Sequence, residues 1–276
     1  MKFNLKSLVV AAAFVAAGAA NAAPLTLNEG GSVTDQGWTV SGLTGSGTLE
    51  FSGALRGALS LANVSFVQVD PAQLIVEGAP DDRTRIEASA PVNSLTGTFD
   101  GTTVSISGVQ TSGGATQILP DASAPNATDA STGGFVTITN LRVDLISNDI
   151  YATLIGGNGV GTVNNLKLWH INSIVGDTSF AAVEGVTTSV NVLGGLTIYD
   201  EAYQLFTTAA GLTEFGAGVL AGVNDLEINP EGYGTIRSSI SVTAARASAV
   251  PEPSTYALTG LGLVAVGLVA RRRKAQ

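Results

Sequence analysis

Short runs in which polar and apolar residues alternate, separated by turns rich in glycine, recur through most of this chain. Residues 64–70 alternate well, and residues 135–145 do so over a longer stretch. Alternation with a period of two places one set of side chains on each face of a β-strand. The pattern therefore predicts a mainly β protein, an antiparallel β-sandwich or another sheet-rich ectodomain.

The turn residues predict three hairpins within this body. One joins residues 64–70 to 73–78 through Pro71-Ala72, and a second turns at Asp100-Gly101. Asp-Gly is among the strongest short hairpin signals, because both residues tolerate a positive φ. The third hairpin turns at residues 147–149, between the alternating runs 135–145 and 150–155.

Helical spacing replaces alternation over residues 198–210, which predicts one short helix. The apolar positions at this spacing are Ala202, Leu205, Phe206 and Ala209. Thr197 and Asp200 have the spacing of a capping box, and Gly211 stands where a helix would end. Residues 53–62 are compatible with a short helix or a loop, and residues 218–228 are expected to return to a strand.

The folded body is expected to span residues 23–250. A stretch rich in Ser, Thr, Gly, Ala and Pro at residues 111–133 predicts a long loop, and a division into two domains at this loop is an alternative. The chain has no cysteine, so disulfides, thiol catalysis and cysteine-based metal sites are excluded.

The body is more acidic than the whole chain, whose formal net charge is −9. Almost half of the 13 basic residues lie in the two chain ends, whereas Glu252 is the one acidic residue there among 22. An acidic body has no electrostatic reason to bind nucleic acid. The same charge keeps an exported protein soluble.

The N-terminus has the three parts of a secretory signal peptide at residues 1–22. Lys2 and Lys6 form a basic region, residues 8–17 are apolar, and Ala20-Asn21-Ala22 forms an A-x-A cleavage site before Ala23. The chain is therefore expected to use the Sec export machinery and to lose this segment.

The C-terminus combines a short apolar helix with a basic cluster. Residues 255–270 carry no charge and would span roughly 24 Å as a helix, against about 30 Å for a bilayer core. Arg271, Arg272, Arg273 and Lys274 follow directly. Positive residues stay cytoplasmic, so the body is expected outside a membrane that this transmembrane helix engages transiently.

Residues 250–254, Val250-Pro251-Glu252-Pro253-Ser254, precede that helix. This order of motif, helix and basic cluster resembles the PEP-CTERM sorting signal, here residues 251–276. The resemblance implies processing by an exosortase, a cysteine transpeptidase-like enzyme of the inner membrane, in a Gram-negative bacterium that makes exopolysaccharide or biofilm. The two prolines fix φ and remove two backbone donors, which keeps the stretch extended for a protease-like groove.

Residues 134–229 resemble the HtaA-type surface domain, which binds haem. The strand rhythm and the segment "LT…DEAYQLF…AAGL" carry this second resemblance. No haem ligand is transferred from it, and no cofactor is expected.

Three side chains are the speculative ligand contacts of the body: Trp38, Trp169 and His170, the only histidine. The indole rings suit stacking on sugar or packing in a core. His170 lies on one face of a strand, as an ordinary strand residue or as a ligand or base that needs a fixed partner. The sequence contains no G-x-S-x-G motif and no D-x-D-x-D-G calcium loop, so no catalytic residue and no metal site are assigned.

These features predict an exported, exosortase-processed, non-catalytic protein of the cell surface or extracellular matrix. Its expected partners are the exosortase, the export machinery and the membrane, with exopolysaccharide as a candidate. A carbohydrate-binding module, a haem-binding surface domain and an extracellular hydrolase remain the alternatives.

Overall fold

The computed structural model describes residues 22–247 of the 276-residue chain. The signal peptide up to residue 21 and the C-terminal sorting segment, including the expected helix 255–270, lie outside these residues. Three helices are present among them: α1 (Gly53–Leu61), α2 (Asp200–Ala209) and α3 (Glu214–Val223).

The strands form one antiparallel, 16-stranded sheet, which confirms the mainly β prediction. In chain order they are β1 (Ala23–Asn28), β2 (Ser32–Asp35), β3 (Trp38–Phe51), β4 (Ser65–Val69), β5 (Gln73–Ala79), β6 (Asp82–Phe99), β7 (Thr103–Thr111), β8 (Gly114–Leu119), β9 (Gly134–Asp144), β10 (Asp149–Gly156), β11 (Gly161–His170), β12 (Ser173–Gly176), β13 (Ser179–Ala181), β14 (Gly185–Gly194), β15 (Thr197–Ile198) and β16 (Gly234–Arg246). The main path runs β12-β14-β16-β3-β6-β7-β9-β10-β11-β15.

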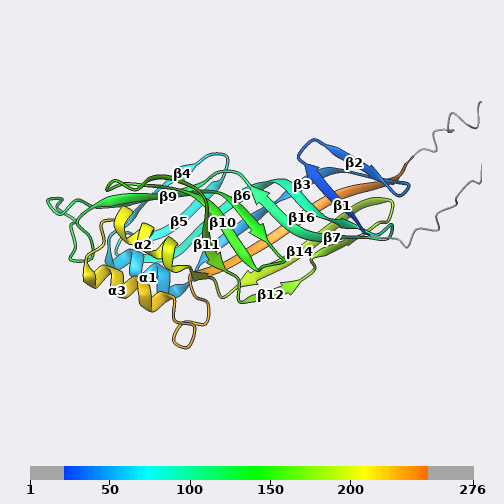
Figure 1. Ribbon diagram of the computed structural model, residues 1–276. Coiled ribbons are helices and arrows are strands. Elements are labelled where there is room, and N and C mark those ends of the chain that lie inside the picture. Colours follow the sequence, from blue (N-terminus) through cyan, green and yellow to red (C-terminus); the bar gives the residue numbers. More distant parts are fainter. Residues whose placement is uncertain (1–21, 248–276) are drawn as a thin grey trace, which may run out of the picture.

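The molecule is elongated, with different elements at its two ends (Figure 1). The helices α1, α2 and α3 gather at one end. Strands β1 and β2 lie at the other, where Arg246 at the end of β16 pairs with Trp38 at the start of β3. The last described strand therefore ends far from the helices.

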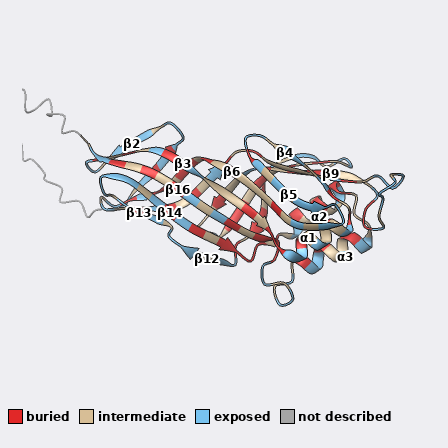
Figure 2. Ribbon diagram, turned by 180° about the vertical axis from the view of Figure 1, so that it is seen from behind, coloured by how far each residue is buried: buried red, intermediate tan, exposed pale blue. Residues whose placement is uncertain are grey.

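Two clusters of buried side chains form the core. The larger one joins the helices to the strands around them, and Leu154, Leu168 and Leu196 are fully buried in it. The smaller one lies among β1, β3, β6, β7, β13 and β16, with Leu27, Phe99 and Ile240 at its centre. Buried and exposed positions alternate along the long strands (Figure 2), as the period of two predicts.

Two of the three predicted hairpins are confirmed. β6 and β7 pair around Asp100-Gly101, with Phe99 opposite Val104, and the Asp100 carboxylate accepts hydrogen bonds from the N–H groups of Thr102 and Thr103. β9 and β10 pair next to residues 147–149, with Asp144 opposite Asp149.

The hairpin predicted at Pro71-Ala72 is wrong. β4 pairs with β8, and β5 pairs with β6. Alternation describes a strand's two faces, but it carries no information about which neighbour completes its hydrogen bonds. The loop expected at residues 111–133 is shorter than predicted, because β8 occupies residues 114–119. The remaining residues, 120–133, join β8 to β9, and these two strands pair with each other in the same sheet.

The helix expected at 198–210 is confirmed as α2, but its predicted capping box is wrong. Tyr199 is the N-cap residue and its side chain caps no N–H group. Residues 53–62, for which the sequence allowed a helix or a loop, form helix α1. Its N-cap is Ser52, whose hydroxyl accepts a hydrogen bond from the N–H of Leu55.

The strand expected at 218–228 is wrong, because α3 continues to Val223. Its N-cap, Thr213, accepts a hydrogen bond from the N–H of Gly216. A Cβ on Gly216 would lie 2.1 Å from the carbonyl oxygen of Ala130, so only glycine allows the helix this close. The periodicity of a short apolar run does not distinguish a helix from a strand. Here the N-cap hydrogen bond and the close packing of Gly216 against Ala130 favour the helix.

Candidate functional site

The three side chains singled out from the sequence do not come together in one site. Trp38 lies in the smaller core cluster with 6% of its surface exposed, and the Arg246 guanidinium lies 4.1 Å from the centre of its ring. Trp169 lies in the larger cluster with 4% exposed. Neither ring offers a face to solvent, so sugar stacking on these two indoles has no geometric support.

His170 has the fixed partner that its functional interpretation requires. Asp149, the first residue of β10, pairs with His170 at the end of β11, and its Oδ1 lies 3.3 Å from His170 Nδ1. Tyr199, just before α2, donates its hydroxyl proton to the same oxygen and lies 3.3 Å from His170 Nδ1. Lys167 Nζ lies 3.0 Å from Asp149 Oδ2 and 4.2 Å from the centre of the Tyr199 ring. We call these four residues the Asp149 cluster.

Asp149 is the centre of this cluster because the other three residues all contact its carboxylate. Its side chain is only 4% exposed. Burial alone would raise its pKa, but hydrogen bonds from Tyr199, Lys167, Ser147 and His170 outweigh burial and hold the pKa well below its usual range. The bonds to Tyr199 and Asp149 raise the pKa of Lys167 to about 12. Burial and the bond to Asp149 also raise the pKa of Tyr199. The cluster is therefore an ionised carboxylate with a charged lysine and a neutral phenol.

The sequence indicated only part of the Asp149 cluster. Lys167 and His170 are the only lysine and the only histidine of the body and lie on one strand, which is a usable signal. From the sequence alone, Asp149 is interpreted as an ordinary turn residue, and Tyr199 as a residue next to the start of a helix. Only the pairing of β10, β11 and β15 brings the three segments together.

The arrangement has the geometry of a structural ion cluster. A hydrolytic triad needs a Ser, Thr or Cys nucleophile hydrogen-bonded to the second histidine nitrogen. Among residues 22–247, His170 has hydrogen bonds through Nδ1 alone, to Asp149 and Tyr199. The same residues contain no group of three His, Cys, Asp or Glu side chains that would hold a metal ion.

Removing the Asp149 charge is expected to lower the free energy of unfolding by about 2 kcal/mol at pH 7, because buried hydrogen bonds to a charge are lost. The folded-state pKa is depressed, so the unfolded chain takes up this proton first as pH falls. The contribution of the Asp149 carboxylate to the free energy of unfolding should therefore decrease below about pH 4. Denaturant unfolding of the wild type and of Asp149→Asn at pH 7 and pH 3 measures this.

The exposed carboxylate at the start of α2 supplies the control for that comparison. Asp200→Asn should change stability by less than about 1 kcal/mol, through the helix dipole alone. A difference between the wild type and Asp149→Asn that stays constant from pH 7 to pH 3 would contradict the assigned charge state.

A second feature is an apolar cavity of about 130 Å³ in the larger core cluster. It extends to Val92 and Ile106 of the smaller cluster, and none of its lining residues is charged. Trp169 lines it, and the buried Nε1–H of this residue has no acceptor in the described part of the chain. At about 24 cal/mol per Å³, such a void costs roughly 3 kcal/mol of stability relative to a filled core.

A third feature is the outer face of the sheet formed by β14, β16, β3 and β6, which carries hydroxyl residues together with the exposed side chains of Val186 and Val190. Hydroxyl residues face each other across these strands: Thr188 opposite Ser241, and Ser239 opposite Ser46. The Thr188 and Ser241 hydroxyls lie 2.8 Å apart. We call this surface the hydroxyl face.

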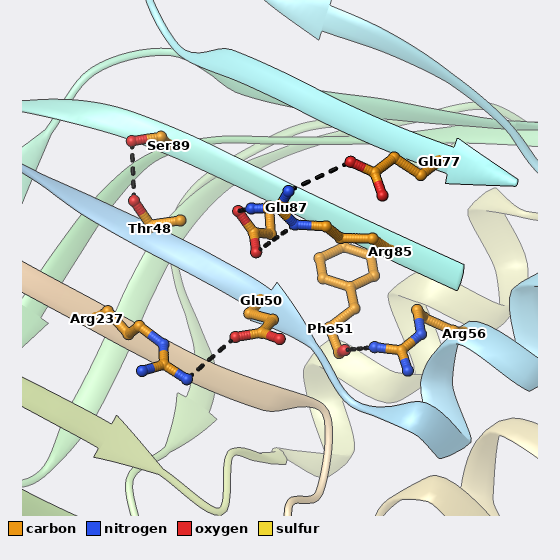
Figure 3. Close-up of polar contacts among 9 residues, drawn as sticks. All are labelled: Thr48, Glu50, Phe51, Arg56, Glu77, Arg85, Glu87, Ser89 and Arg237. Atoms are coloured by element: carbon orange, nitrogen blue, oxygen red, sulfur yellow. Dashed lines mark hydrogen bonds and ion pairs between the residues drawn. The ribbon is translucent and has the colours of Figure 1, made fainter. Parts of the chain in front are cut away.

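The end of the hydroxyl face nearer the helices carries paired charges (Figure 3). There Thr48 donates to Ser89 at 2.9 Å, and Arg237 lies 3.4 Å from Glu50. Arg85 contacts both Glu87, at 2.8 Å, and Glu77, at 3.3 Å. Each of the two guanidinium groups is paired, but they meet three carboxylates, so this group of five residues carries one net negative charge.

Comparison with known proteins identifies the segment that follows β16. Residues 249–274 match the model of the PEP-CTERM protein-sorting motif. The chain carries a PEP-CTERM sorting signal. This signal marks an exported protein whose C-terminal membrane-anchoring tail is cleaved by an exosortase, leaving a cell-surface or extracellular protein. Within residues 22–247, we find no helix with the length and apolar character needed to cross a bilayer.

The body itself has less informative matches. No curated protein matches the sequence. Among solved structures, the haem-binding protein HtaB from Corynebacterium glutamicum aligns with a TM-score of 0.38 and 14% identity, over 75% of this chain and 97% of that protein. At this TM-score and identity, the similarity carries no argument about the fold or the function of the body.

Proposed function

We propose that this PEP-CTERM protein is a non-catalytic component of the extracellular layer, released or displayed by exosortase cleavage, whose body associates with exopolysaccharide. The observation that carries the proposal is the position of the sorting signal. Four residues separate Arg246, the end of β16, from Pro251. Even fully extended, this connection reaches only about 17 Å, and the eight residues between Arg246 and Thr255, where the expected transmembrane segment begins, reach only about 31 Å. The uncut tail therefore holds the folded body near the membrane.

The hydroxyl face is the surface best suited to exopolysaccharide. Its Ser and Thr side chains recur at the spacing of a sheet, about 4.8 Å between strands, and can exchange hydrogen bonds with a row of sugar hydroxyls. The chain is acidic, which disfavours an anionic polymer. A neutral glycan held by many weak contacts is therefore the expected partner.

Two added charges on the hydroxyl face should reduce this association at least fivefold. The double variant Thr188→Glu/Ser239→Glu alters exposed positions on β14 and β16. The amount of processed protein that sediments with exopolysaccharide from the same cells measures the effect.

A matched control adds the same two charges on other strands. Thr26→Glu/Thr162→Glu alters exposed positions on β1 and β11 and should sediment like the wild type. Equal sedimentation of both double variants, or no sedimentation of the wild type, would refute the role of the hydroxyl face.

The haem and hydrolase alternatives have weaker support in the geometry. Folding does bring Tyr199 to His170, but the phenol donates to Asp149 and its pKa is raised, which disfavours a phenolate that would bind iron. Within the described residues, no Ser, Thr or Cys side chain is hydrogen-bonded to His170, so the cluster gives no geometric support to a hydrolytic triad.

A further inference from the structure

The apolar cavity is unexpected in a protein interior of this kind. Protein cores are packed about as densely as organic crystals and contain few voids larger than a water molecule. Cavities of this volume lined by Leu, Ile and Phe stay dry and bind small apolar molecules such as benzene. The cavity described above, about 130 Å³, has a similar size and a mainly apolar lining, with Leu49, Phe51 and Ile236 among its walls. Its polar lining residues, all uncharged, include Thr111, Gln117, Asn191 and Ser238.

We propose that this cavity is a binding site for a small uncharged hydrocarbon group, about the size of benzene. The lining has no charged residue to pair with a carboxylate or an ammonium group, so a charged ligand head would have to remain outside. The burial of apolar ligand surface is the driving force. The group can belong to a free small molecule or to the end of a longer amphiphile, because the chemistry inside the cavity is the same.

The access side is indicated by lining residues that also reach the surface. Leu61, at the end of α1, lines the cavity and is 45% exposed, and Val219 on α3 lines it and is half-buried. Both belong to the helical end of the molecule, opposite the end of β16 (Figure 1). While the tail holds the β16 end at the membrane, the helical end lies at the far end of the body. A ligand from the extracellular side therefore meets this entrance first.

Gly47 provides a position from which a larger side chain can fill the cavity. It lines the cavity on β3, and a Cβ at this position would lie 3.7 Å from Ile236 Cγ2 and 3.9 Å from Thr111 Cγ2, both ordinary contacts. Gly47→Val therefore occupies cavity volume with a residue that favours strands. Ala88→Val, on the neighbouring strand β6, fills the same cavity from another wall if the first variant does not fold.

The experiment uses processed protein from the cell exterior and two probes, benzene and a long-chain fatty acid. We expect benzene to raise the thermal midpoint by several degrees and to change the emission of Trp169, isolated by Trp38→Phe. Gly47→Val should weaken benzene binding at least tenfold. The control Gly222→Ala, on α3, places its methyl group where nothing beyond its chain neighbours and its own helix backbone lies within 4 Å, and it should bind as the wild type does.

The outcomes separate the two sources of the hydrocarbon group. Fatty acid that binds at least tenfold tighter than benzene, and loses affinity in Gly47→Val, assigns the site to the end of an amphiphile. Benzene that binds as tightly as the fatty acid, or more so, assigns it to a free small molecule. The proposal fails if neither probe binds, or if Gly47→Val and Gly222→Ala respond equally to both probes.

Discussion

Replacing Pro251, Glu252 and Pro253 together by alanine will leave the protein uncut and held at the membrane. The sorting motif spans residues 249–274, so the substitution alters the recognition sequence and leaves the apolar segment and basic cluster in place. Alanine also restores two backbone N–H groups and frees φ at two positions, so the restrictions that the two prolines place on the backbone are lost. Fractionation should show nearly all of the variant in the membrane fraction.

Mass spectrometry gives the second measurement of this prediction. Wild-type protein recovered outside the cell should lack residues 254–276, whereas the variant should retain the Arg271–Lys274 cluster. Ser248→Ala, just outside the matched motif, is the control and should be processed normally. A triple variant released at the wild-type size would show that the Pro-Glu-Pro residues do not direct cleavage.

Gly45→Ala is expected to destabilise the body by more than about 3 kcal/mol, because it combines backbone strain with a clash. Gly45 lies on β3 with a φ of +145°, which L-residues rarely adopt. A Cβ there would lie 2.3 Å from the carbonyl oxygen of Ser239 and 2.8 Å from Ile240 Cα. Both atoms belong to the backbone of β16, which cannot move without breaking the centre of the sheet.

The same strand contains the matched control for this prediction. Gly47→Ala places its methyl group in ordinary contact and should be neutral or up to about 1 kcal/mol more stable, because alanine loses less backbone entropy than glycine. Urea unfolding midpoints of the two variants compare them directly. Similar midpoints would show that β3 and β16 do not approach as closely at Gly45 as described.

Local chemistry was sufficient for several elements of this fold. The alternating runs, the Asp100-Gly101 turn and the turn at residues 147–149 all correspond to strands and hairpins of the structure. The spacing of apolar residues at 198–210 was enough for α2. These features were predictable because each depends on residues adjacent in the chain.

The errors share a different cause. β4 and β5 were correctly placed as strands but wrongly paired with each other, since their partners β8 and β6 are chosen by the whole sheet. α3 was taken for a strand because its apolar run alone does not reveal the contact between Gly216 and Ala130. The Asp149 cluster and the cavity were missed because each draws on segments far apart in the sequence.

The amino-acid sequence by itself determined where this protein goes and what kind of secondary structure it forms. The sorting signal is one continuous segment of sequence, and strand periodicity is a local property, so neither depends on a fold. Only the tertiary structure decided which strands are neighbours, that Trp38 and Trp169 are buried, and that an apolar cavity lies beneath the helices. These properties arise from packing between distant segments, whose contacts no single stretch of sequence specifies.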